Sequence, residues 1–258
     1  MKSAWLIVRL PAVALAGLLQ VPVVAQAPGE TLWHHRNLGK AFYENPTTRA
    51  EAVEEFRQAL ALAPDSARER VNYGLALLRA GRTAEGVAEL ERAKQQDPRL
   101  PHTWFNLGIV FKRESQYERA VAEFEQMVKL VPGDAVSHYN LGYVYKLTAR
   151  PVEALAAFER AAALDPNMAG PRFQLYNAYR DAGRPDDAAR ELKRFQDLRR
   201  RQTGAAVPED LDWGYYAEIY DPADTTMSAD ASEPSAVSFV RQKSDDVADP
   251  ARAGLLVL

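Results

Sequence analysis

The sequence predicts an all-α protein, a solenoid in which helical hairpins stack one after another. Three observations predict this fold. Apolar residues and one proline recur with a period of 34 residues, turn-forming residues recur between the expected helices, and no strand-like alternation of apolar and polar residues runs through residues 31–202. A period of this length, with large and small apolar residues at fixed offsets, is typical of repeated helical hairpins.

The composition fits one or two ordinary globular domains. The chain has 258 residues, 47% of them hydrophobic and 26% charged, with a formal net charge of −3. This charge argues against a dedicated nucleic-acid binder. The absence of cysteine excludes disulfides, thiolate metal sites and cysteine nucleophiles, and it fits an oxidising compartment.

Residues 1–27 have the pattern of a secretory signal peptide. A short basic start with Lys2 and Arg9 precedes the apolar stretch Leu10–Val24, and small residues around Ala25 offer a cleavage site. The other interpretation is an uncleaved membrane anchor, but the stretch falls short of the about 20 apolar residues that span a bilayer. We therefore expect an exported protein, periplasmic or secreted, that touches a membrane only through this segment if it is uncleaved.

The period predicts five repeats over residues 32–202, with the boundaries 32–66, 67–100, 101–134, 135–168 and 169–202. In each repeat, small residues let the two helices approach, and a large residue of the second helix fills the gap between neighbouring hairpins. Proline closes the second helix of the first four repeats. These prolines are Pro64, Pro98, Pro132 and Pro166.

Two repeats depart from the pattern. The first carries an extra residue in its turn, within residues 45–48, and the fifth has Tyr176 where glycine is usual. The second helix of the fifth repeat also runs on through residues 193–202. Terminal repeats are often atypical, because one of their faces lacks a neighbour.

The third repeat carries the pattern most completely. Its residues Trp104, Leu107, Gly108, Phe111, Ala120, Phe124 and Pro132 follow the offsets W-x2-L-G-x2-Y and A-x3-F followed by proline. These offsets resemble those of the tetratricopeptide repeat. The resemblance covers residues 32–202 and implies a right-handed α-solenoid of helix-turn-helix hairpins, whose first helices line a concave groove that binds a protein or peptide.

By this resemblance, five positions of each first helix face the groove. Their charged side chains are mostly basic, with aromatic side chains among them, which suits an extended or helical peptide segment, including an acidic one. The plainer interpretation is that the basic side chains only solvate an exposed helix face. The expected peptide-binding residues are Arg36, Lys40, Arg79, His102, Phe105, Lys112, Arg113, Tyr139, Tyr143, Lys146, Phe173, Asn177 and Arg180.

An asparagine recurs at position six of four repeats, as Asn37, Asn72, Asn106 and Asn140. This asparagine is common in the family, and it binds either a ligand backbone or only a neighbouring helix. The carboxylate clamp of chaperone-binding members is not reproduced in the groove, so no C-terminal carboxylate ligand is predicted.

No pattern indicates catalysis. The four histidines lack the spacing of a zinc site, the acidic residues lack the glycine of a calcium loop, and neither a phosphate-binding loop nor a nucleophile elbow occurs. His138 takes the slot of Trp104, which indicates packing. For His102, one alternative is a groove histidine that titrates near neutrality. We expect a non-enzymatic scaffold with no cofactor, no metal and no nucleic-acid partner.

The chain changes character after the repeats. Residues 203–222 concentrate aromatic side chains and are predicted to pack as a cap on the last hairpin or to fold back into the groove. Residues 223–250 are predicted to be a disordered, flexible, acidic linker, and residues 251–258 an apolar strand-like end.

Charge is divided between the array and this tail. Residues 32–202 contain 27 Lys and Arg against 23 Asp and Glu, whereas residues 203–258 contain 3 against 11. One hypothesis is that the protein's own acidic tail contacts the basic groove or competes with its ligand. The other is an acidic linker that charge keeps soluble.

The stretches at residues 34–45 and 215–222 also resemble the N-terminal part of bacterial exported proteins in which tetratricopeptide repeats precede an FG-GAP β-propeller with an ASPIC/UnbV tail. This resemblance implies a longer protein, of which the chain is a truncated part. It leaves open two alternatives to peptide binding, an assembly module that packs against a partner or propeller domain and an accessory module of an enzyme encoded by other sequence.

Overall fold

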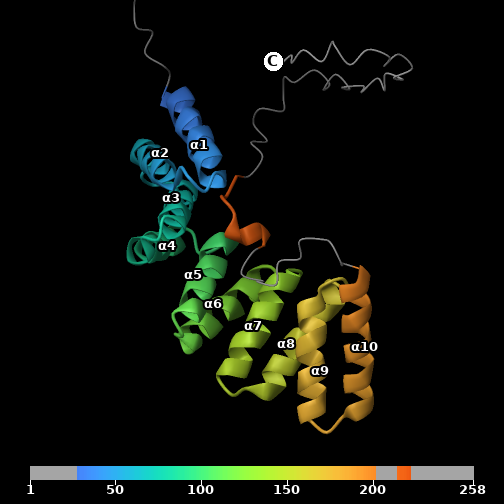
Figure 1. Ribbon diagram of the computed structural model, residues 1–258. Coiled ribbons are helices and arrows are strands. Elements are labelled where there is room, and N and C mark those ends of the chain that lie inside the picture. The colour runs from blue at the N-terminus through green and yellow to red at the C-terminus, as the bar shows by residue number, and fades with distance from the viewer. Residues whose placement is uncertain (1–27, 202–213, 222–258) are drawn as a thin grey trace, which may run out of the picture. The chain divides into compact units, whose positions relative to one another are not determined.

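The computed structural model describes residues 28–201 and 214–221, in which it contains ten α-helices, one short 3-10 helix and no strand (Figure 1). The all-α prediction is confirmed. The first helices of the hairpins are α1 (Pro28–Glu44), α3 (Ala67–Arg79), α5 (Pro101–Arg113), α7 (Ala135–Leu147) and α9 (Ala169–Asp181). The second helices are α2 (Arg49–Leu62), α4 (Thr83–Gln96), α6 (Tyr117–Leu130), α8 (Pro151–Leu164) and α10 (Pro185–Arg201), and η1 (Tyr215–Ala217) follows.

The predicted signal peptide, flexible linker and strand-like end lie outside the described residues. Within the array, each first helix packs against its own second helix, and each second helix packs against the first helix of the next repeat. No helix in the described part of the chain is both long and apolar enough to cross a membrane.

The helix boundaries repeat with the predicted period. From α3 onward the first helices begin 34 residues apart, and so do all the second helices. Residues 45–48 connect α1 to α2, whereas three residues connect the two helices of every later hairpin, so the extra residue predicted in the first repeat is confirmed. The second helices of repeats one to four end two residues before the predicted prolines, because a proline there prevents the helix from continuing.

The spacing of glycine and a large residue that recurs from repeat to repeat has a direct steric cause. A Cβ atom placed on Gly108 would lie 2.9 Å from the ring of Phe124, and one on Gly142 would lie 2.8 Å from the ring of Phe158. Both rings are fully buried. Each ring sits against the glycine of its own hairpin, a contact that the prediction did not name, and Phe158 also lines the pocket between the fourth and fifth repeats.

The turns between the two helices of a hairpin share one backbone geometry. The middle turn residue has a positive φ, from 56° to 78°, at Gly81, Ser115, Ala149 and Gly183. In the second repeat, the next amide, that of Arg82, donates to the carbonyl of Leu77 at 2.9 Å, and the equivalent bond closes the other three helices. Glycine adopts this left-handed conformation freely, whereas a residue with a Cβ atom is strained there by about 1–2 kcal/mol.

A second repeated contact joins the start of α3, α5 and α7 to the proline that closes the preceding repeat. The indole nitrogen of Trp104 donates to the carbonyl of Pro98 at 2.8 Å, and Nε2 of His138 lies 3.1 Å from the carbonyl of Pro132. The prediction that His138 packs in the slot of Trp104 is confirmed. Desolvation by burial lowers the pKa of His138, although the carbonyl partner works in the other direction.

Tyrosines of two first helices also bind the preceding repeat. The hydroxyl of Tyr145 donates to Glu125 at 2.8 Å, and that of Tyr179 donates to Glu159 at 2.6 Å. Burial, together with the acceptor carboxylate, raises the pKa of each tyrosine to about 12. Each hydroxyl thus remains a donor at neutral pH and links two consecutive repeats.

Candidate functional site

The first helices of the repeats hold a segment of the chain's own C-terminal region. Residues 214–221, named the tail segment from here on, lie along these helices, with η1 against α5 (Figure 1). At its start Gly214 borders Val136 of α7, and at its end Tyr220 bonds to Asn72 of α3. The tail segment therefore runs from the fourth repeat towards the second, opposite to the order of the repeats.

Side chains from three repeats bind the main chain of the tail segment. Asn106 donates from Nδ2 to the carbonyl of Tyr216 at 2.7 Å, and the hydroxyl of Tyr43 donates to the carbonyl of Ala217 at 3.4 Å. Asn72 makes two bonds to Tyr220, donating to its carbonyl at 3.1 Å and accepting from its amide at 2.8 Å. These contacts recognise a peptide backbone and do not depend on its side chains.

The side chains of the tail segment pack around His102 of α5. The centroid of the imidazole ring lies 4.6 Å from that of Tyr220, 5.2 Å from that of Tyr216 and 5.8 Å from that of Tyr215. Phe105, one turn further along α5, is fully buried, with its ring centroid 6.5 Å from that of Tyr216. Two residues predicted to line the groove are thus covered by the tail segment.

His102 is neutral at physiological pH. Its side chain is 2% exposed and its Nδ1 atom has no hydrogen-bond partner among the described residues. Desolvation lowers its pKa to about 4, because burial without an acceptor disfavours the charged ring. The alternative of a His102 that titrates near neutrality is therefore wrong for the groove with the tail segment in place.

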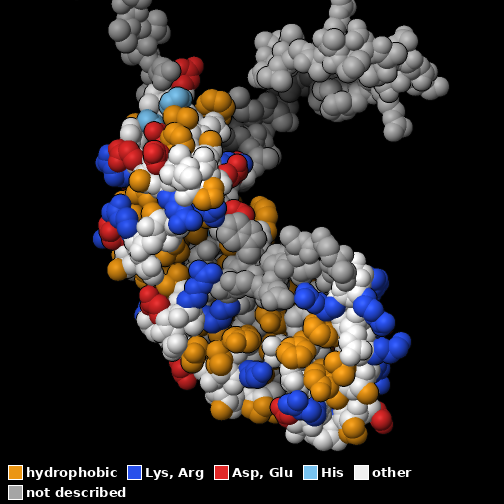
Figure 2. Space-filling view, in the orientation of Figure 1, with side chains coloured by type: hydrophobic (Ala, Val, Ile, Leu, Met, Phe, Trp, Pro, Cys, Tyr) orange, Lys and Arg blue, Asp and Glu red, His pale blue; other side chains and the backbone are white. Residues whose placement is uncertain are grey.

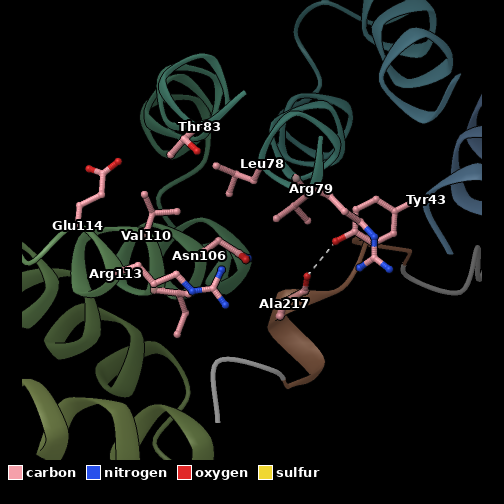
Figure 3. A pocket seen from close by; sticks show the side chains of 11 residues that line it. Tyr43, Leu78, Arg79, Thr83, Asn106, Val110, Arg113, Glu114 and Ala217 are labelled. Carbon is pink, nitrogen blue, oxygen red and sulfur yellow. Dashed lines mark hydrogen bonds between the residues drawn. The ribbon is translucent and has the colours of Figure 1, made fainter. Parts of the chain in front are cut away.

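A pocket of about 310 Å³ opens beneath Ala217, between the second and third repeats. Its walls include the aliphatic side chains of Leu75, Leu78, Ile109 and Val110. Figure 3 shows Leu78 and Val110 pointing into this space, and the hydrogen bond from Tyr43 to Ala217 at its edge. Ala217 is the one residue of the tail segment that lines the pocket.

Charged groups surround the edge of this pocket. Arg113 and Glu114 line it from α5 and the turn that follows, and Arg79 lines it from α3, stacked 4.5 Å above the ring of Tyr43 (Figure 3). Burial raises the pKa of the Glu218 carboxyl, and the charge of Arg79 opposes that rise. An acidic residue of the tail segment therefore interacts with a basic residue of the groove.

The groove differs over the fourth and fifth repeats. There the position-six amides accept hydrogen bonds from lysines of the preceding repeat, Lys112 to Asn140 at 2.7 Å and Lys146 to Gln174 at 3.1 Å. Figure 2 shows hydrophobic side chains interspersed with Lys and Arg on the face that α7 and α9 present. A second pocket, of about 420 Å³, lies between these repeats and includes Phe158 in its lining.

The predicted peptide-binding residues fall into two groups. Those near the tail segment or its pocket are Arg79, His102, Phe105 and Arg113. Those elsewhere on the first helices are Arg36, Lys40, Lys112, Tyr139, Tyr143, Lys146, Phe173, Asn177 and Arg180.

Several members of the second group have partners within the array. Arg36 donates to the fully buried Glu69 at 2.7 Å, so part of the predicted basic surface neutralises an acidic side chain. Arg180 bonds to the adjacent Asp181 at 2.8 Å, and Nδ2 of Asn177 donates to a carbonyl of its own helix at 3.0 Å. The acidic partners of Arg36 and Arg180 reduce the net positive charge that a ligand would meet.

The prediction of groove residues did not include the side chains that bind the tail segment's main chain, Tyr43, Asn72 and Asn106. The recurrence of asparagine at position six was a usable signal, since it left ligand binding open. The signal that separates Asn140 from Asn72 and Asn106 is Lys112 in the preceding repeat, which binds Asn140 and has no lysine counterpart before the other two.

The family is identified by its model. The tetratricopeptide repeat model matches residues 37–101 and 105–169, which is 130 of the 258 residues. The chain belongs to the tetratricopeptide repeat family. The first match runs from within α1 to the first residue of α5, and the second from within α5 to the first residue of α9. No curated protein sequence matches the chain.

Solved structures with the same repeat fold include those of MamA. The chain is similar to "MamA 41-end from Desulfovibrio magneticus RS-1", with 21% identity and a TM-score of 0.61 over 68% of this chain and 99% of that one. It is also similar to "MamA RS-1 ArsTM double mutant", with 21% identity and a TM-score of 0.62 over 68% and 98%. At these identities the likeness concerns the tetratricopeptide repeat fold alone.

Proposed function

We propose that this protein is a non-catalytic scaffold whose groove binds an extended segment of a partner protein. The observation that carries the proposal is the pair of hydrogen bonds between Asn72 and the backbone of Tyr220. An amide that both donates to and accepts from one residue's main chain provides affinity for any extended peptide. Neighbouring side chains then provide specificity.

The chemistry of the tail segment supports a partner that is aromatic and acidic. Its tyrosines contact His102, while Glu218 interacts with Arg79. Aromatic anchors in a desolvated pocket contribute most of the affinity in typical interfaces, and charge steers association. A partner segment with this chemistry would compete with the tail segment for the same groove.

A fluorescent peptide with the sequence of residues 214–221 tests the proposal. The full chain carries Tyr220→Pro, which removes the amide that donates to Asn72 and the ring that packs on His102, so the groove is available in trans. We expect saturable binding by fluorescence anisotropy. Adding Asn72→Ala should weaken binding about tenfold, because two hydrogen bonds are lost.

Asn37→Ala is the matched control. It removes the same side chain from position six of the first repeat, where the amide donates to Trp33 of its own helix. Equal loss of binding in both variants, or no saturable binding to the Tyr220→Pro chain, would contradict groove recognition. In that case the alternative of an assembly module becomes the better proposal, and analytical ultracentrifugation should then detect self-association.

We also propose that the protein is exported to the periplasm or secreted, and that it forms the repeat-containing part of a longer protein with an FG-GAP propeller. The signal-like residues 1–27 and the absence of cysteine support export. Cell fractionation combined with N-terminal sequencing tests the proposed export. A cytoplasmic product that retains Met1 would contradict export.

A further inference from the structure

We propose that the pocket beneath Ala217 is a specificity pocket, which takes a large apolar side chain of the partner segment where the tail segment offers only a methyl group. The inference rests on the proposed function, since it assumes that a partner segment binds where the tail segment lies. The occupant is an extended segment with aromatic residues at the places of Tyr216 and Tyr220, and with Leu, Met or Phe at the place of Ala217.

The pocket has room for such a side chain. Its volume of about 310 Å³ is at the lower end of the roughly 300–1,000 Å³ that ligand pockets span. Ala217 lies at its edge and is 8% exposed, so a longer side chain at this place is directed towards the protein interior. The carbonyl of Ala217 is held by Tyr43, which fixes the position of the Cβ atom relative to the pocket.

The chemistry of the walls favours an apolar occupant. Leu75, Leu78, Ile109 and Val110 form an aliphatic part of the wall, whereas Arg79, Thr83, Asn106, Arg113 and Glu114 line the rest. Burying three more carbon atoms of a leucine against such walls strengthens binding by roughly ten- to fiftyfold. The tail segment forgoes this contribution, so a partner that supplies it would displace the tail segment.

The corresponding junctions of the array differ from this one. Seven lining positions of the pocket between the fourth and fifth repeats correspond to lining positions of this pocket at an offset of 68 residues, but Leu78 is replaced by Lys146 and Ile109 by Asn177. At the junction between them, the positions of Thr83 and Ile109 carry Tyr117 and Tyr143. The aliphatic side chains of Leu78, Ile109 and Val110 are therefore not repeated together at these two junctions.

The first test uses the full chain and the exchange rate of the Tyr220 amide, which donates to Asn72 when the tail segment is bound. Hydrogen exchange measured by mass spectrometry reports this protection. Ala217→Leu should raise it about tenfold. Tyr215→Leu, which places the same side chain at a residue that is 69% exposed, should not raise it.

Two further variants separate the possible outcomes. Ala217→Met tests whether a flexible side chain enters where leucine meets a clash, and lower protection in both variants would overturn the proposal. Ala217→Glu tests the polar edge formed by Arg79 and Arg113. A larger gain with glutamate than with leucine would overturn the apolar assignment.

The second test adds synthetic peptides of residues 214–221 to the full chain with Tyr220→Pro. We expect the peptide with Ala217→Leu to bind about tenfold more tightly than the peptide with alanine. If both bind equally, the specificity pocket is wrong and groove binding stands. If neither binds in trans while Ala217→Leu still protects the Tyr220 amide of the otherwise unchanged chain, the proposed function is wrong, and the pocket serves only the tail segment.

Discussion

In the second and third repeats, the amides of Asn72 and Asn106 bind the main chain of the tail segment. In the fourth and fifth repeats, the corresponding amides accept hydrogen bonds from Lys112 and Lys146. Both sets of amides occupy position six of their repeats and lie on the same face of the first helix. What differs is the side chain at position twelve of the preceding repeat.

Position twelve is Tyr43 before the second repeat and Leu78 before the third, and neither can donate as a lysine ammonium does. A lysine there occupies the amide oxygen of the next repeat, whereas Tyr43 and Leu78 leave the amide to the tail segment. The contrast teaches that the motif builds equivalent first helices, and that a residue outside the motif distinguishes the amides that bind the tail segment from those that bind a lysine.

The largest effect should come from removing a core ring in the third repeat, which binds the tail segment, or in the fourth repeat. Phe124→Ala and Phe158→Ala should each lower the free energy of unfolding by about 3–5 kcal/mol, because each empties a buried site against a glycine. Thermal denaturation followed by circular dichroism measures the loss. Only Phe124→Ala should also expose the Tyr220 amide to exchange, because Phe124 supports α5. Equal exchange of the Tyr220 amide in both variants would mean that the third and fourth repeats do not respond separately.

Acidification should release the tail segment from the first helices that bind it. The pKa of His102 is about 4 with the tail segment bound, against about 6.5 for an ordinary histidine. The bound state therefore holds fewer protons below pH 6.5, and its stability is complete above that value and lost as the pH falls towards 4. Between pH 8 and 5.5, protection of the Tyr220 amide, corrected for intrinsic exchange, should fall about tenfold.

His102→Phe should remove this pH dependence, whereas His138→Gln should retain it, because His138 lies outside the tyrosine cluster. The Glu218 carboxyl, whose pKa burial raises, gains protons on binding and works in the opposite direction. Its effect increases at lower pH, which is why the measurement stops at pH 5.5. A dependence that survives in His102→Phe would assign the titration to another group.

A finer test gives the second repeat the lysine that the third and fourth repeats carry at position twelve. Leu78→Lys places an ammonium where Lys112 and Lys146 lie in the next repeats, so it should bond to Asn106 and add a charge to the apolar pocket. Protection of the Tyr220 amide should fall about fivefold, since one backbone contact is weakened. Ala88→Lys, a lysine added at an exposed position of α4 away from this pocket, is the control and should leave the protection unchanged.

The smallest effect concerns the turns. Ala149 adopts a φ of 56° in the turn of the fourth repeat, where the second repeat has Gly81 with a φ of 78°. Ala149→Gly should raise the free energy of unfolding by about 1 kcal/mol, and Gly81→Ala should lower it by a similar amount. Urea denaturation measures both changes, and neither should alter the exchange of the Tyr220 amide.

Much of the fold could be predicted because the repeat is encoded locally. The offsets between Gly108 and Phe124, the proline at 132 and the extra residue in the first turn each act within one hairpin, over distances that a helical period fixes. The same locality explains why His138 could be assigned to the slot of Trp104.

Only the tertiary structure decided where the chain's own aromatic segment lies. The sequence concentrates tyrosines at residues 215–220 and predicts a cap on the last hairpin or a segment folded back into the groove. In the structure η1 packs against α5 of the third repeat, so the prediction of a cap on the last hairpin is wrong for this part. The contact between Asn72 and Tyr220 joins residues 148 positions apart, and it depends on whether a lysine already satisfies the amide. Such a contact is set by complementary surfaces brought together in space, which no periodicity along the chain records.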